Sequence, residues 1–443
     1  MEKIINKFKS YFIIISFLLI VFIEFRGLIF NINKAFVDWG DTSFISWQIT
    51  ITRDKLLNLD FKNIDTTNSH YPYQGSLYFT DSFIGQSIIA ISLFFIKNPI
   101  LVYNIIFIIT ILLNYYSSYL LFKKLTNSEI SGFLGSIFLN NSVYFFDQII
   151  HLQTITYWPM ILLLYFLLKK KPFLAGIYLS IQFYMAVYLG IFSFFLVGIY
   201  YAIYFFFNIK EIKTIIVHTF ILGGIFFLLT YPFLIKKYLD FQKTYHQVRD
   251  MNEIIANSGN ITDYQYFLPK TLFSKIPIVE KYNQNVRFTT ERMSFPGIII
   301  MIGALFGIFT YKTKKKSIYL LFFLALIGLG FVFSLGPRLM INGQYKILPL
   351  PYLLFLKQFE FLFSIRLTHR WAIFLIIGLV YFSSKYYSKL SKSFIFVILI
   401  LFFIESVPKI DIKIKPVLNE AYQFLISKKL NNKILLEYPL LSF

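Results

Sequence analysis

Two aspartates near the N-terminus have the residue type and spacing best suited to acid–base chemistry in this chain. Asp38 and Asp41 lie three residues apart in the run Asp38-Trp39-Gly40-Asp41. On a helical turn, residues three apart share a face, so both carboxylates would point the same way. A carboxylate so placed can take a proton from a hydroxyl group while a leaving group departs. The competing interpretation is that Asp41 caps a helix over residues 42–50.

A pair of arginines supplies the chemistry that an anionic leaving group needs. Arg366 and Arg370 are four residues apart, so a helix would present both on one side, with His369 between them. A guanidinium group forms paired hydrogen bonds with phosphate, and a departing phosphate gains charge as its bond breaks. We therefore predict that the two arginines bind a phosphate group. The alternative is that both extend to lipid headgroups at a membrane surface.

The run from residue 146 to 153 contains a further pair, Asp147 and His151, at helical i, i+4 spacing. Two ligands are fewer than a metal site needs, and a histidine satisfied at a membrane interface is the competing interpretation. We predict no metal and no cofactor, and a divalent ion held by the carboxylates stays open as an alternative. The sequence has no P-loop, dinucleotide fingerprint or HExxH motif. The candidate substrate-binding residues are Asp81, His151, Gln153, Tyr188, Glu291 and His369.

The composition places these residues in a membrane protein. Of the 443 residues, 57% are hydrophobic and 21% aromatic, more apolar surface than a soluble domain can bury. The formal charge is +21, but the lysines cluster in short connections between apolar runs, as expected beside anionic lipid headgroups. No nucleic-acid-binding motif is present, so we predict no nucleic-acid partner. The absence of cysteine excludes disulfides and thiolate metal sites.

The apolar segments predict an all-α integral membrane fold with about eleven transmembrane helices. A spanning helix needs about 20 mainly apolar residues. No small-x-small cleavage site follows the first apolar run, so the first helix is expected to be retained. The predicted spans are 11–30, 100–122, 130–147, 154–168, 172–188, 190–207, 214–236, 295–311, 317–335, 369–386 and 393–407.

Lysines in the short connections predict the orientation in the cytoplasmic membrane. With the N-terminus inside, every compact basic cluster falls on the inner side, and the candidate site residues fall on the outer side. The clusters are Lys3 with Lys7 and Lys9, Lys123-Lys124, Lys169 to Lys171, Lys210 with Lys213, Lys312 with Lys314 to Lys316, and Lys385 with Lys389.

This topology requires that residues 82–97 do not cross the membrane, because a span there would move Lys123-Lys124 outside. The segment is short and has polar edges, so we predict an interfacial helix on the outer surface, and we predict the same for residues 350–364. Residues 1–407 then form one polytopic domain, and residues 408–443 form a short outer α/β tail or a truncated domain. The outer loops of the domain are 31–99, 237–294 and 336–368.

Several short stretches occur in an order that resembles the GT-C superfamily of polytopic membrane glycosyltransferases, in particular its bacterial members. They are Gly40-Asp41 with Trp47, Tyr71-Pro72 through Asp81, Gly85-Gln86, Asn98-Pro99 with Tyr103-Asn104, His151-x-Gln153, Leu335-Gly336-Pro337, and Arg366 through Arg370. The layout is also similar: an inside N-terminus, one helix, a long outer loop with early acidic residues, a surface helix, and a helix that ends in a basic turn.

This resemblance implies transfer of a sugar from a polyprenyl-phosphate donor to a glycan, lipid or protein acceptor at the outer face. Asp41, or Asp38, would be the general base, and Arg366 with Arg370 would hold the donor phosphate. The chain departs from the pattern in two ways: the first loop has no pair of adjacent acidic residues, and the C-terminal region is short.

Other functions are compatible with the same sequence. A polymerase of cell-envelope polysaccharide would also act on lipid-linked glycans, and a non-catalytic relative would share the fold. A transporter or flippase would place charges or broken helices near mid-membrane. Here the predicted helix centres are almost free of charge, because Glu24 and Arg26 are expected near an outer end and Gln182 is only polar. We therefore favour the transferase.

Overall fold

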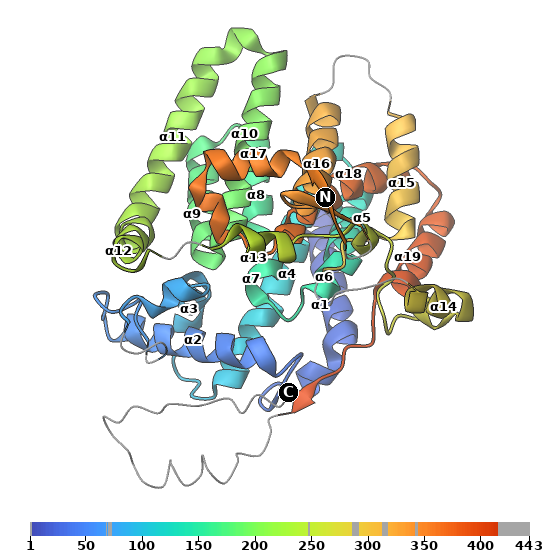
Figure 1. Cartoon of the computed structure of the whole chain (residues 1–443). Helices are drawn as coiled ribbons and strands as arrows, with labels where there is room; N and C mark the ends of the chain where they lie inside the picture. The colour runs from blue at the N-terminus through green and yellow to red at the C-terminus, as the bar shows by residue number, and fades with distance from the viewer. Residues whose placement is uncertain are drawn as a thin grey trace.

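The computed structural model shows a predominantly helical protein (Figure 1). It describes residues 2–67, 69, 73–246, 249–285, 292–311, 318–341 and 344–414, with the backbone alone for 2–10 and 345–347. Most of the predicted tail and the lysines between 312 and 316 lie outside the described residues. The helices are α1 (Glu2–Phe30), α2 (Gly40–Leu57), α3 (Ile84–Ile91), α4 (Pro99–Thr126), α5 (Glu129–Asn140), α6 (Val143–Asp147), α7 (Leu152–Ile155), α8 (Trp158–Leu168), α9 (Pro172–Met185), α10 (Val187–Phe207), α11 (Ile212–Thr230), α12 (Lys236–Tyr245), α13 (Met251–Ala256), α14 (Pro277–Asn285), α15 (Ile298–Phe309), α16 (Ile318–Ser334), α17 (Pro351–Gln358), α18 (Ala372–Tyr387) and α19 (Lys392–Ser406).

Every predicted apolar span contains a helix or a pair of helices. Among the described residues, four helical stretches are long and apolar enough to cross a membrane: Tyr11–Phe30, Pro99–Thr126, Val187–Phe207 and Ile209–Tyr245. Leu152–Leu168, Pro172–Met185, Ile298–Phe309 and Ile318–Ser334 are shorter apolar helices. The fold is therefore that of an all-α protein with several helices able to span a membrane, and the number eleven stays a prediction.

Large apolar side chains cover the outside of several helices. Phe12 on α1 is 72% exposed, Phe220 on α11 is 83% exposed and Phe309 on α15 is 79% exposed. Contiguous exposed apolar surface of this kind is rare on soluble proteins, whereas lipid tails solvate it. These helix faces are the surfaces that a bilayer would contact.

Two of the predicted spans are interrupted. The span 130–147 breaks at Asn141, and the span 154–168 breaks at Thr156 between α7 and α8. Gln182 of α9 closes the second break: its Nε2 donates to the Thr156 carbonyl and its Oε1 accepts from the Met160 N–H, both at 3.0 Å. In an apolar surrounding, backbone groups released by a break must find such partners. Gln182 therefore has a structural role that its sequence context did not show.

The segments 82–97 and 350–364 do not cross the bundle. Helices α3 and α17 contain eight residues each, which is about 12 Å of helix against about 30 Å of bilayer core. α3 buries Gln86 and exposes Ile88, as a helix lying on a surface would. Figure 1 shows α2 and α3 across the lower end of the bundle. These lengths agree with the prediction that neither segment spans the membrane, and their place on the outer surface stays a prediction.

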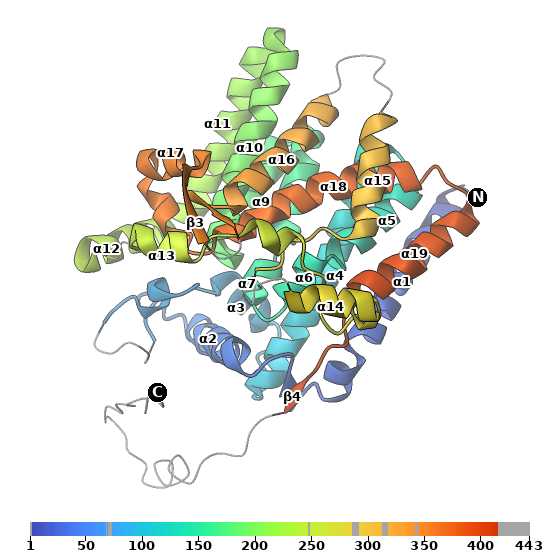
Figure 2. The same cartoon turned by 45° about the vertical axis from the view of Figure 1, so that its right-hand side comes forward.

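Those predicted inner connections that the structure describes lie toward the opposite end. Figure 2 shows α10, α11, α15 and α16 rising toward this upper end. Lys170, after α8, pairs with Glu211, before α11, at 3.2 Å. Lys385, near the end of α18, lies 3.6 Å from the ring centroid of Tyr311, which follows α15. The fold therefore separates the basic connections from α2 and α3.

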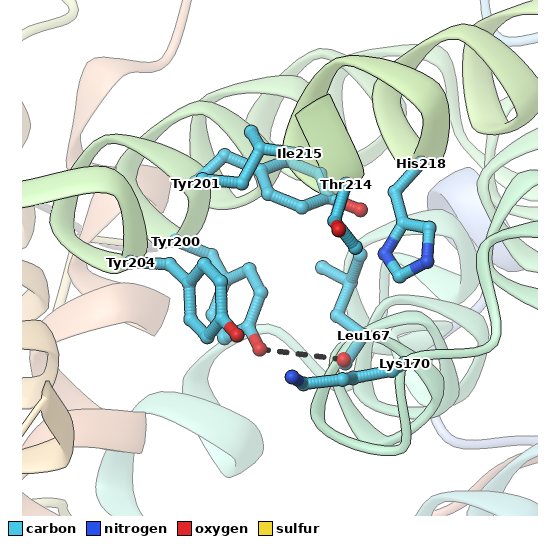
Figure 3. Close-up of a pocket in the computed structure, with 8 residues that line it drawn as sticks. All are labelled: Leu167, Lys170, Tyr200, Tyr201, Tyr204, Thr214, Ile215 and His218. Carbon is cyan, nitrogen blue, oxygen red and sulfur yellow. Dashed lines mark hydrogen bonds between the residues drawn. The ribbon is translucent and has the colours of Figure 1, made fainter. Parts of the chain in front are cut away.

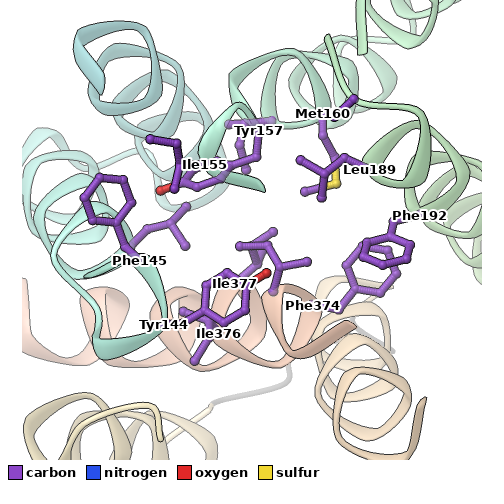
Figure 4. Close-up of a cluster of buried hydrophobic side chains, with 14 of the residues drawn as sticks. Tyr144, Phe145, Ile155, Tyr157, Met160, Leu189, Phe192, Phe374, Ile376 and Ile377 are labelled. Atoms are coloured by element: carbon purple, nitrogen blue, oxygen red, sulfur yellow. The ribbon is translucent and has the colours of Figure 1, made fainter. Parts of the chain in front are cut away.

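The helices pack closely around an aromatic and aliphatic core, part of which is shown in Figure 4. Phe192 of α10 stacks on Trp371 with ring centroids 3.8 Å apart. On α15 and α16, small residues let the backbones approach α18: a Cβ at Gly307 or Gly330 would lie 2.4 Å from the backbone of Phe382 or Leu375. Small residues at helix interfaces are typical of membrane bundles.

Short irregular elements and strands complete the fold. Strand β1 (Ala35–Phe36) pairs antiparallel with β4 (Lys413–Ile414), so the start of the tail lies beside the first loop. Strands β2 (Arg338–Ile341) and β3 (Gln344–Pro349) form a hairpin that the sequence did not predict. The short 3-10 helices used below are η1 (Ser76–Phe79), η4 (Ile261–Tyr264), η6 (Glu360–Ser364) and η7 (Thr368–Trp371).

Candidate functional site

Most of the predicted site residues converge at the end of the bundle where α2 begins. Asp41 comes from the start of α2 and Asp81 from the connection between η1 and α3. His151 precedes α7, Tyr188 lies in the first turn of α10, and Arg370 lies in η7 just before α18. Five segments therefore bring their polar groups to one place. Glu291 lies outside the described residues.

Asp41 and His151 form the first pair of ionisable side chains in the site. Asp41 Oδ2 lies 3.1 Å from His151 Nδ1. The Asp41 side chain is 63% exposed, whereas that of His151 is 6% exposed. A carboxylate that is open to solvent and backed by a buried imidazole can both meet a substrate and exchange a proton.

Asp38 has a local structural role. Its Oδ2 accepts from the Gly40 N–H at 2.8 Å, and its carbonyl accepts from the Thr42 hydroxyl. Helix α2 begins at Gly40 with Trp39 as its N-cap, so Asp41 is inside the first turn. The expectation that Asp41 caps the helix is therefore wrong, and so is the placement of both carboxylates on one helical turn, because Asp38 precedes the helix.

Asp81 and Arg370 interact electrostatically and form the second pair of ionisable side chains in the site. Arg370 is the opposite charge that acts most strongly on the half-buried Asp81, and the Gln153 side chain forms a hydrogen bond with it. Burial raises the pKa of Asp81, while Arg370, Gln153, His151 and Arg249 act in the opposite direction. The site therefore holds two carboxyl groups in different environments, one exposed and one half-buried beside a guanidinium.

The position of Arg370 is fixed by its neighbours. Its guanidinium carbon lies 4.8 Å from the ring centroid of Tyr188, and the Tyr144 hydroxyl donates to its carbonyl at 3.1 Å. The next residue, Trp371, is held by its stacking on Phe192. Arg370 Nε has no hydrogen-bond partner among the described residues. A buried guanidinium that is held in place and has an N–H group without a hydrogen-bond partner can bind an anion.

Arg366 lies in a different environment. Its side chain is 49% exposed, and its Nη1 is 4.0 Å from Glu253 Oε1, a carboxylate that Arg249 also contacts at 2.8 Å. The chain between η6 and η7 is not helical. The predicted presentation of Arg366 and Arg370 on one helix face is therefore wrong: one arginine is at the surface, and the other is buried on Tyr188.

His369 connects the site to the segment before α15. Its Nε2 lies 3.3 Å from Gln148 Nε2, and Gln148 donates to Asp147 Oδ2 at 2.8 Å. The Met293 N–H donates to the same oxygen at 3.1 Å. Helix α6 ends at Asp147, so the i, i+4 helical argument for Asp147 with His151 does not apply.

Two residues of the site were not among the candidates. Gln148 stands between Asp147 and His151, so its place in that polar run was an available signal. Arg249 acts on Asp81 from a long connection, where position in the sequence gives no signal. Among the described residues, no group of three or more His, Asp or Glu side chains is arranged to hold a metal ion.

The fold and the site together define a helical protein with several helices long and apolar enough to span a membrane and a group of ionisable side chains at one end. Comparison with protein-family models, curated proteins and solved structures finds no match. The function must therefore be argued from the site itself.

Proposed function

We propose that this protein is a glycosyltransferase of GT-C type, which moves a sugar from a polyprenyl-phosphate donor to an acceptor at the outer face of the cytoplasmic membrane. The observation that carries the proposal is the meeting of the exposed Asp41–His151 pair with Arg370 and Asp81 at one end of an apolar helical bundle. The lipid carrier would lie along the apolar helix faces and bring its phosphate to this end.

In this mechanism Asp41 takes the proton from an acceptor hydroxyl, and the hydroxyl oxygen forms a bond to the anomeric carbon of the sugar. The bond from that carbon to the phosphate oxygen breaks, and the electron pair leaves with the polyprenyl phosphate. Arg370 stabilises the negative charge that develops on this phosphate. The substrate would contact Asp81, Gln153, Tyr188 and His369, and the mechanism uses no metal or cofactor.

The orientation is part of the proposal. The basic connections that favour the cytoplasmic side gather at the end opposite Asp41, as Lys170 and Lys385 illustrate. The same rule then places the site outside, where polyprenyl-linked donors are consumed after they have crossed the membrane.

The first test is the substitution Asp41→Asn in a transfer assay with a polyprenyl-phosphate sugar. Loss of the base is expected to lower the rate by a factor of about 10² to 10⁴. Asp240→Asn is the matched control, because Asp240 is an exposed carboxylate on α12 at which no base is proposed. Full activity of Asp41→Asn would show that Asp41 is not the base. If the wild-type protein also transferred no sugar, the proposal would be wrong.

A transporter or flippase is the second candidate, and one observation favours it. Interrupted helices at Asn141 and Thr156 are typical of transporters, whose broken helices surround the substrate. A lipid-linked sugar would then be moved without losing its sugar. Liposome assays separate the two functions, because a transferase changes the chemical form of the donor and a flippase changes only its leaflet.

A further inference from the structure

A carboxyl group that the site does not use is buried between α1 and α4. Glu24 is one residue before Phe25, whose ring packs on Phe107 of α4 with centroids 5.4 Å apart. Both carboxyl oxygens of Glu24 are buried, and the polar group that faces them is the hydroxyl of Tyr115, about halfway along α4. Glu24 lies six residues before the end of α1 at Phe30, and its carboxyl group is turned into the bundle.

Tyr115 links this carboxyl group to the break between α5 and α6. Asn141 Nδ2 donates to the Tyr115 hydroxyl at 2.6 Å. Asn141 is completely buried, and its Oδ1 has no hydrogen-bond partner among the described residues. The break thus turns the Asn141 amide toward Tyr115 and leaves the amide oxygen without a donor among the described residues.

None of the described side chains that interact with Glu24 is a cation. Tyr115 on α4 faces it directly, and Tyr157, at the start of α8, interacts with Tyr115 and donates to Asn140 at 2.9 Å. No lysine or arginine of the described residues forms an ion pair with Glu24, and Arg26 turns its guanidinium to the Ile23 carbonyl. An ionised carboxylate left unpaired within a bilayer is expensive, and such residues mark ion or proton sites.

We propose that Glu24, Tyr115 and Asn141 form a binding site for one monovalent cation, which arrives from water as a proton or as sodium. The Glu24 oxygens and the Tyr115 oxygen are the acceptors that a cation would bind, and Asn141 holds the Tyr115 hydroxyl in place by donating its Nδ2 hydrogen to it. A proton would lie between two of these oxygens, whereas sodium would be coordinated by the carboxyl and the hydroxyl oxygens together. A cation also removes the unpaired negative charge that burial penalises. This site is separate from the Asp41–His151 pair and does not depend on the sugar-transfer proposal.

The test uses the full-length protein in liposomes and a membrane-soluble carbodiimide, dicyclohexylcarbodiimide. The protonated carboxyl group adds across one C=N bond: the oxygen bonds to the central carbon, the proton goes to nitrogen, and nothing leaves. Mass spectrometry of the digested protein is expected to find the adduct on Glu24 in sodium-free buffer at neutral pH. A water-soluble carbodiimide is expected to leave Glu24 unmodified and to label exposed acids such as Glu129.

Three variants and one salt series complete the design. Glu24→Gln, which keeps shape and polarity, is expected to lose the adduct, while Glu129→Gln retains it. Tyr115→Phe is expected to change the labelling rate of Glu24 several-fold, because it removes the hydroxyl that shares the cation. Protection by sodium would identify sodium as the ligand, and insensitivity to sodium would identify the proton. No labelling of Glu24 in sodium-free buffer, or labelling by the water-soluble reagent, would overturn the proposal.

Discussion

The two ends of the helical bundle use the same kinds of ionisable residue in different surroundings. At the upper end, Lys170 and Glu211 pair at 3.2 Å with side chains 54% and 42% exposed. At the other end, His151 and Arg370 are buried, and Asp81 is half-buried. Exposed pairs contribute about 0–1 kcal/mol, whereas charges in a less polar environment interact more strongly.

Aromatic residues show the same contrast. Figure 3 shows Tyr200, Tyr201 and Tyr204 lining a small pocket together with Lys170 and His218 at the upper end. Lysine and tyrosine at the rim of an apolar bundle are typical anchors at a membrane–water interface. Tyr188, at the other end, is instead buried under Arg370. The same residue type therefore has a different role at each end, set by its surroundings. The difference between the two ends can be tested.

The largest expected effect is the separation of the two ends by a membrane. In this cysteine-free chain, Lys34→Cys near β1 and Lys124→Cys at the end of α4 both place a thiol on an exposed position. On intact cells, an impermeant thiol reagent is expected to label the cysteine at position 34 and not that at 124. Permeabilised cells should show labelling at both. The reverse pattern would show that the orientation is opposite to the predicted one. Labelling at both positions on intact cells would show that no membrane separates the two ends.

A smaller effect is expected from single cations. Arg370→Ala should weaken donor binding about 10- to 100-fold, because a hydrogen bond to a charged group contributes about 1.5–3 kcal/mol. Arg366→Ala should weaken it by at most about fivefold, since Arg366 is exposed and shares Glu253 with Arg249. Titration of the donor in nanodiscs gives both affinities.

Lys170→Ala is the control for Arg370→Ala, because it removes a cation from the opposite end. It should leave donor affinity unchanged. Arg370→Lys should recover part of the affinity if charge matters and lose the part that needs a planar guanidinium. An equal loss of donor affinity in Arg366→Ala and Arg370→Ala would instead support the prediction from the sequence that both arginines bind one phosphate.

The smallest effect is a pH dependence in the loop that precedes α15. Burial raises the pKa of Asp263 in η4 to about 7, although the Asn260 N–H and Arg292 favour its charged form. Because the folded state prefers the protonated carboxyl, this contribution to stability is fully present below the unfolded pKa of about 4 and is lost as the pH rises through 7. The slope is at most about 1.4 kcal/mol per pH unit.

Hydrogen exchange of the η4 amides measures this effect as protection factors between pH 4 and pH 8. Asp263→Asn retains an acceptor for the Asn260 N–H, which donates to Asp263 at 2.7 Å, and should remove the pH dependence. Protection in the wild type that rises with pH would contradict the assignment. No comparable change is expected at the exposed Lys170–Glu211 pair.

The sequence by itself determined where the apolar helices form and which polar residues lie at their ends. A run of about 20 apolar residues is a local property, so the apolar helices such as α1, α4, α10 and α11 follow from hydropathy, whereas α12, α13 and α14 in the predicted loop 237–294 do not. Alternation of the basic connections then assigned Asp41, Asp81, His151 and Arg370 to one end. These assignments need no knowledge of how the helices pack.

Only the tertiary structure decided which of these residues meet. Asp41 pairs with His151 because α2 crosses the end of the bundle, and Arg370 separates from Arg366 because the chain between them is irregular. The break at Asn141 and the burial of Glu24 against Tyr115 likewise depend on neighbouring helices. Hydropathy is a property of each segment alone, whereas the pairing and burial of side chains depend on contacts between segments that lie far apart in the chain.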